Sequence, residues 1–69
     1  MIRKGSTVHW TWGAHSASGQ VVERFDRTVR RTIKGTAITK HGSPENPAFL
    51  IEQDDGDRVL KLRSELQES

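Results

Sequence analysis

Basic side chains gather in one short segment of the chain. Residues 24–34 contain five of them: Arg24, Arg27, Arg30, Arg31 and Lys34. Arginine binds phosphate through forked, charge-assisted hydrogen bonds, so such a cluster is typical of an anion-binding surface. The alternative is a solvated face that Glu23 and Asp26 partly neutralise. Residues 1–34 carry seven bases and two acids, a net +5, and residues 35–69 carry four bases and seven acids, a net −3. This asymmetry favours an anionic partner, unless the two halves interleave and neutralise each other in the fold.

Aromatic side chains are the second group that could contact a ligand, and the chain has only four of them. Trp10 alternates with Val8 and is predicted to pack in the core. Trp12 has the same parity but ends its strand before Gly13, where the ring would either cover the mouth of the fold or stack on a base or a cation. We expect Phe49 at the same apolar mouth. The predicted binding surface therefore comprises Trp12, Arg24, Arg27, Arg30, Arg31, Lys34 and Phe49.

No arrangement of residues in the sequence indicates catalysis or metal binding. The three histidines are widely spaced and cysteine is absent, whereas a metal site needs converging ligands. The run Asp54-Asp55-Gly56-Asp57 lacks the twelve-residue frame and the bidentate glutamate of a calcium loop, so turn formation explains it better. Ser6, Ser16 and Ser18 have no neighbouring acid–base pair that would activate a nucleophile. We therefore expect a protein that is not an enzyme and that uses no metal or cofactor.

The apolar residues recur with a period of two, which predicts short β-strands that present these side chains. Small and polar stretches over residues 13–19 and 41–47 are predicted loops, and Pro44 and Pro47 exclude strand hydrogen bonds in the second. The run Ala48–Glu52 is apolar on both faces, which predicts a strongly covered strand. The predicted strands cover residues 8–12, 20–25, 29–33, 36–40, 48–52 and 58–62, and a short helical turn at 64–66 places Leu66 on the core.

Register arguments predict two hairpins. A three-residue loop at 26–28 would place Phe25 opposite Val29, and it would also place Arg24 opposite Arg30 on the other face. Val21, Glu23 and Phe25 would then share one face of their strand. A three-residue loop at 54–56 would pair Leu50 with Leu60 and Glu52 with Arg58, and it would use the freedom of Gly56 to adopt positive φ. A two-residue loop is the alternative in each case.

Length and composition limit the chain to one small domain. It has 69 residues, of which 32% are hydrophobic, and without cysteine it must be held by packing alone. We expect this domain to span residues 1–69, with its core at about 4–67. No run approaches the roughly 20 apolar residues of a membrane span, and the N-terminus turns polar at once. We therefore expect a soluble, cytoplasmic monomer.

Four pieces of the chain, taken in order, resemble one known family. They are Lys4-Gly5-x-x-Val8-x-Trp10, Gly19-x-Val21-Val22, the strand that begins Pro47-Ala48-Phe49, and the Asp55-Gly56 turn followed by Ser64-Glu65-Leu66. Together they resemble the hypervirulence-associated protein TUDOR domain family, small stand-alone bacterial and fungal domains. The resemblance implies an SH3-like barrel made from a single strongly bent sheet, and it implies no catalytic residue. Tudor domains that read methylated lysine or arginine surround the cation with several aromatics. This chain has no tyrosine and does not match a complete cage.

The sequence thus predicts an all-β fold, a small SH3-like or Tudor-type barrel of five to six antiparallel strands, that acts as a small non-enzymatic binding module. Nucleic acid, bound through the basic hairpin, is the slightly preferred partner. The alternatives are a Tudor-like module that binds a protein or peptide, and a structural or stress-associated small protein with no dedicated site.

Overall fold

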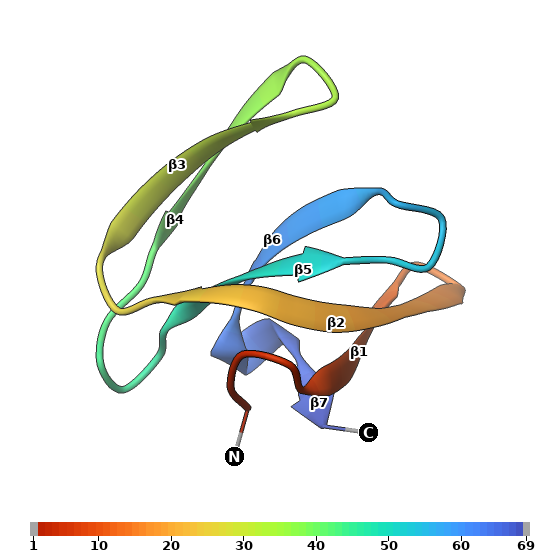
Figure 1. The fold of residues 1–69 in the computed structure, drawn as a ribbon, viewed down its shortest axis with the longest axis horizontal. Helices are drawn as coiled ribbons and strands as arrows, with labels where there is room; N and C mark the ends of the chain where they lie inside the picture. The colour runs from red at the N-terminus through yellow and green to blue at the C-terminus, as the bar shows by residue number, and fades with distance from the viewer. Residues whose placement is uncertain (1, 69) are drawn as a thin grey trace.

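The computed structural model describes residues 2–68, apart from the side chains of Trp12 and Glu68. Within this part of the chain, six antiparallel strands and a two-residue seventh form two sheets (Figure 1). One sheet has the order β6-β5-β2-β1-β7, and the other is the hairpin β3-β4. The elements are β1 (Thr7–Trp12), β2 (His15–Phe25), β3 (Thr28–Ile33), β4 (Thr36–His41), β5 (Ala48–Glu52), β6 (Arg58–Leu62), the 3-10 turn η1 (Arg63–Glu65) and β7 (Gln67–Glu68).

The predicted all-β class and the turn near the C-terminus are confirmed, and the arrangement is consistent with a small Tudor-type, SH3-like barrel. The strands form two sheets rather than the single sheet that the resemblance implied. The five-stranded sheet bends around one apolar cluster, and the β3–β4 hairpin lies against its other side (Figure 1). No helix among residues 2–68 is long and apolar enough to cross a membrane.

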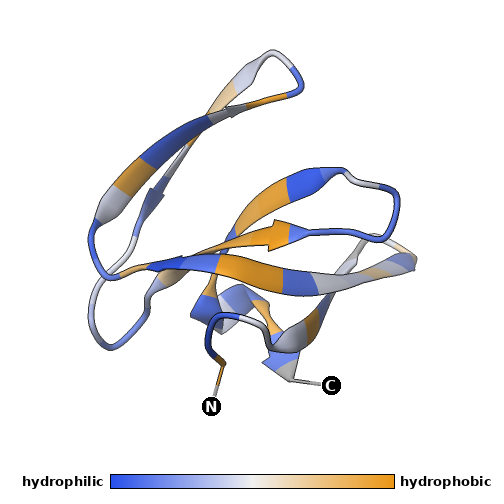
Figure 2. Cartoon of the chain, in the orientation of Figure 1, coloured by the Kyte–Doolittle hydropathy of each residue, from blue (hydrophilic) through white to orange (hydrophobic). Residues whose placement is uncertain are grey.

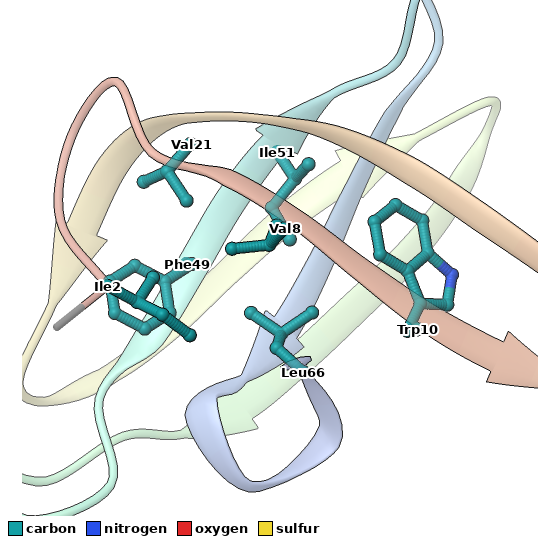
Figure 3. Close-up of a cluster of buried hydrophobic side chains, with 7 residues drawn as sticks. All are labelled: Ile2, Val8, Trp10, Val21, Phe49, Ile51 and Leu66. Atoms are coloured by element: carbon teal, nitrogen blue, oxygen red, sulfur yellow. The ribbon is translucent and has the colours of Figure 1, made fainter. Parts of the chain in front are cut away.

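The first apolar cluster fills the inside of the bent sheet (Figure 3). Val8 and Trp10 project into it from β1, and Leu66 enters from the segment after η1. Trp10 and Leu66 expose only 4% and 7% of their surface, which confirms their predicted core positions. The members of this cluster are Ile2, Val8, Trp10, Val21, Phe49, Ile51 and Leu66.

Strand β5 is buried on both faces, as its sequence predicts, because alternate residues serve two clusters. Phe49 and Ile51 face the first cluster, whereas Ala48 and Leu50 face a second one beneath the β3–β4 hairpin. Figure 2 shows the apolar segments of β2, β5 and β6 gathered at the centre of the molecule. The buried members of the second cluster are Phe25, Val29, Ala48, Leu50 and Leu60, with Val22, Ile33, Ile38 and Leu62 packed against them.

A β-bulge in β2 contradicts the prediction that Val21 and Phe25 lie on the same face of their strand. Val21 pairs with Ile51 and Glu23 pairs with Leu50, so Val22 is an extra residue in β2. A bulge of this kind shifts the alternation by one. Val21 therefore faces the first cluster, and Phe25 faces the second.

The predicted hairpin between residues 20–25 and 29–33 is wrong. The first of these segments pairs with β5, which sets Arg24 opposite Phe49, and β3 pairs with β4, which sets Arg30 opposite Thr39. Strand β5 is the most apolar partner in the chain, so pairing with it buries more surface than pairing with β3. Phe25 and Val29 still meet, but in the second cluster rather than across a ladder.

The predicted loop at residues 13–19 is also wrong, because a tight turn replaces it. Trp12 pairs with His15, so only Gly13 and Ala14 connect β1 to β2. Gly13 has φ +56°, which suits the first central position of a type II′ hairpin turn. The small and polar residues that follow are strand residues because they pair with β1 along its whole length.

Two further turns match their sequences. In the β5–β6 hairpin Leu50 pairs with Leu60 and Glu52 with Arg58, and Gly56 has φ +87°, which confirms the three-residue loop. In the β3–β4 hairpin the turn is Lys34-Gly35, with φ +52° and +79°. Positive φ at both central residues is the requirement of a type I′ turn, which matches the twist of the strands.

Candidate binding surface

The β3–β4 hairpin covers the second cluster and carries three of the seven predicted site residues, Arg30, Arg31 and Lys34, with Arg27 just before it (Figure 1). Its base is a close crossing of the backbone at Gly42. A Cβ atom on Gly42 would lie 2.8 Å from the carbonyl oxygens of both Phe25 and Arg27, and 2.9 Å from the backbone nitrogen of Ala48. Only glycine fits there without displacing backbone. The segments that enter and leave the hairpin are therefore in close backbone contact at Gly42.

Two ion pairs join the hairpin to the segments on either side of β6, one near the tip of the hairpin and one near its base. At the tip, Lys34 Nζ lies 2.7 Å from Asp57 Oδ2, and at the base Lys40 Nζ lies 3.1 Å from Glu65 Oε1. The hydrogen bond from Lys34 to Asp57, supported by their opposite charges, raises the pKa of the lysine. Both lysines of the hairpin are thus neutralised by carboxylates from outside it.

Glu65 is held in its charged form. Burial raises the pKa of this carboxyl group, but the hydrogen bond donated by the Leu62 N–H at 2.8 Å and the ion pair with Lys40 outweigh burial. The pKa of Glu65 therefore lies below its ordinary value of 4.5. The same carboxylate caps η1 and anchors β4.

The variant Glu65→Gln is expected to be less stable than wild type at pH 7 by up to about 1 kcal/mol, since solvent screens this pair. A group whose pKa is depressed by folding contributes stability above its ordinary pKa, and that contribution is lost as the pH falls through its folded pKa. The difference in melting temperature between the two proteins should therefore shrink from pH 7 to pH 3. Glu45→Gln, an exposed change of the same kind, serves as the control. A difference that stays constant over this range would contradict the assigned role of Glu65.

The arginines of the hairpin region differ from its lysines. Arg27 and Arg31 lie over the ring of Phe25, with guanidinium carbons 5.7 Å and 4.9 Å from its centroid, which are cation–π distances. Arg31 Nη1 also donates a hydrogen bond to the carbonyl oxygen of Arg30 at 2.9 Å. Arg30 is exposed on the outer face of β3, opposite Thr39. Among the side chains that the structure describes, which leave out Glu68, no carboxylate forms an ion pair with any of these three arginines.

The sequence also explains why these charges lie unopposed along the hairpin. Residues 27–44 contain no aspartate or glutamate, so every ionisable side chain on this stretch is basic or a histidine. This gap in the acids was a signal that the sequence analysis missed, and it would have marked the hairpin as one unit. The anchoring roles of Lys40, Asp57 and Glu65 were missed as well, because each depends on a contact between distant segments.

The other predicted site residues do not join the arginine surface. Arg24 borders a separate small cavity that Glu45 and Arg63 also line. Phe49 has no exposed surface, which corrects its predicted place at the mouth of the fold, because it packs in the first cluster. The side chain of Trp12 lies outside the described residues, so its role stays a prediction.

Two cavities flank the Lys34–Asp57 ion pair. One, of about 440 Å³, opens on the β3 side between Arg31 and Leu50, and the other, of about 380 Å³, opens on the β4 side between Ile38 and Leu60. Neither is lined by an aromatic side chain among the residues that the structure describes. These two cavities therefore do not provide the aromatic cage used to read methylated side chains.

Comparison with protein-family models shows a match of residues 5–66 to the hypervirulence associated proteins TUDOR domain. The chain belongs to this family. The predicted resemblance is thereby confirmed over nearly the whole chain. Searches of curated proteins and of solved structures found no significant match. Tudor-type domains are non-catalytic binding folds, so membership of this family points to a small binding module.

Proposed function

We propose that this TUDOR domain binds nucleic acid through the phosphate groups, and that Arg27, Arg30 and Arg31 make the contacts. The observation that supports the proposal is the contrast within the hairpin. Its two lysines are neutralised by Asp57 and Glu65, whereas the three arginines have no partner among the carboxylates whose side chains the structure describes. Arginine is also the side chain best suited to phosphate oxygens.

The number of available charges predicts weak binding with a clear salt dependence. Three phosphate contacts give a slope of log affinity against log salt of about −2 on a single strand and about −2.7 on duplex DNA. Dissociation constants in the range of about 1–100 μM are typical of binding that depends on phosphate contacts alone. No base-reading contact is proposed for these arginines, so sequence preference should be small.

Titration of the protein into fluorescently labelled 12-nucleotide oligonucleotides, one single-stranded and one duplex, tests this function. The expected result is binding in the micromolar range at 50 mM salt that weakens by about tenfold or more at 200 mM salt. Absence of binding at 50 mM salt with protein at about 1 mM would overturn the proposal, as would an affinity that does not change with salt.

The second candidate function is binding of a protein segment. The observation that favours it is the 380 Å³ cavity between β4 and β6, which has an apolar floor and lies away from the three arginines.

A further inference from the structure

The space between β4 and β6 is bordered by two unpaired strand edges. Strand β6 is the last strand of the five-stranded sheet, and β4 pairs only with β3. The cavity between them has an apolar floor made by Ile33, Ile38, Val59 and Leu60. Free strand edges next to apolar pockets are the features by which folded domains bind extended peptides as an added strand.

The directions of the two strands suit such an addition. The Lys34–Asp57 ion pair lies where both strands begin, and the Lys40–Glu65 ion pair lies where both strands end. Strands β4 and β6 therefore run the same way, as Figure 1 also shows. A peptide that runs the opposite way between them would be antiparallel to both, which is the more common pairing in proteins.

The charges that line the cavity favour an acidic occupant. Lys34, Arg58 and Lys61 are basic, and Asp57 is the only acid among the residues that line it. Asp57 Oδ2 lies 2.7 Å from Lys34 Nζ. Arg58 Nη2 lies 3.5 Å from Glu52 Oε2 on the neighbouring strand, so this arginine already has an ion-pair partner. An incoming carboxylate would meet the partly exposed Lys61, whose charge also acts on Glu65, and would compete with Asp57 for Lys34.

We propose that an extended acidic segment of a partner protein docks between β4 and β6, and that one of its carboxylates replaces Asp57 on Lys34. Strands on either side of a third lie about 9.6 Å apart. Some Cα atoms of β4 and β6 are within 8 Å of each other, so the hairpin must swing outward to admit the peptide. An exposed ion pair such as Lys34–Asp57 is weak enough to be exchanged in this way. Asp57 then competes with the carboxylate of the partner for Lys34.

The probe is a synthetic ten-residue peptide of alternating glutamate and valine. Its binding is monitored through the amide chemical shifts of the isotopically labelled protein. The expected shifts lie in β4 and β6, and a peptide of alternating lysine and valine should produce none. Asp57→Asn removes the competing carboxylate and should tighten binding by about 3- to 10-fold. Asp54→Asn is the matched control, because it removes the same charge from the same loop, and no ion pair links Asp54 to Lys34. Its expected effect is below about twofold.

A second variant removes the basic side chain of Lys34 in place of the carboxylate of Asp57. Lys34→Asn keeps the hairpin turn, since asparagine followed by glycine is favoured in a type I′ turn and tolerates the positive φ at this position. It should weaken the glutamate–valine peptide by at least about threefold. Equal effects of Asp57→Asn and Asp54→Asn would overturn the proposal, as would the absence of shifts in β4 and β6 when the peptide is added. An oligonucleotide that shifts β4 and β6 in place of the peptide would also overturn it. The peptide and the oligonucleotides are separate probes, so failure of one proposal leaves the other standing.

Discussion

Replacing Phe49 with alanine is expected to remove a large part of the protein's stability at 25 °C. Phe49 is fully buried in β5 and packs in the first cluster between the two neighbouring strands. Truncation of a buried phenylalanine to alanine costs about 3–5 kcal/mol, because the lost contacts leave a cavity that the surroundings fill only in part. A domain of this length has a total stability of about 3–10 kcal/mol, so the loss is a large fraction of it.

Chemical denaturation followed by circular dichroism measures this effect. Phe49→Leu is the control, because it keeps most of the buried volume and should cost less than the alanine variant. A well-folded Phe49→Ala protein with a stability close to wild type would contradict the buried position of Phe49. It would instead support the predicted place of this ring at a ligand-binding mouth.

Replacing Arg27, Arg30 and Arg31 together with glutamine is expected to abolish most nucleic-acid binding. Loss of three phosphate contacts should weaken affinity at 50 mM salt by more than about tenfold and bring the salt slope close to zero. Arg27 and Arg31 also cover Phe25, so the triple variant should lose about 1–2 kcal/mol of stability through its two cation–π contacts. Its folding must therefore be checked by circular dichroism before binding is compared.

The single variant Arg30→Gln separates binding from stability. Arg30 is exposed and makes no contact with the Phe25 ring, so the variant should be as stable as wild type. The magnitude of its salt slope should decrease by about 0.7–0.9. For the triple variant the matched control has glutamine at Arg3, Lys4 and Arg63, because these exposed bases lie outside the hairpin and their replacement also removes three charges. An equal loss of affinity in the control would show that net charge, and not the arginine surface, governs binding.

Features that depend on neighbouring residues were predictable from the sequence. The alternation of Val8 and Trp10 placed both in the core, and the unbroken apolar run of β5 indicated burial on both faces. Turn chemistry at Gly56 gave the correct register of the β5–β6 hairpin. Each of these inferences compares side chains within a few positions, where steric and periodic rules apply directly.

The pairing of β2 could not be predicted in the same way. The register argument compared two loop lengths between adjacent segments, but the partner that formed was β5, which follows in the sequence after β3 and β4. That outcome depends on the total apolar surface buried by the competing arrangements, which no local pattern contains. The bulge at Val22 has the same origin, because it brings Val21 and Phe25 onto the two faces that β5 separates.

The candidate site was predicted in part. The sequence identified the basic residues, but it could not separate Lys34 from the arginines, because Asp57 reaches it only in the folded chain. It also grouped Arg24 with the others, although Arg24 pairs within the five-stranded sheet and not on the hairpin. The three residues that stay available were thus selected by tertiary structure.

The most direct test of a phosphate-binding arginine surface is an amide chemical-shift map of the labelled protein during titration with the single-stranded 12-nucleotide oligonucleotide. We expect the largest shifts at residues 26–31, with all shifts decreasing as salt rises from 50 to 200 mM. Shifts that are absent at 50 mM salt, or that fall on β1 and β7 and leave residues 26–31 unchanged, would contradict it.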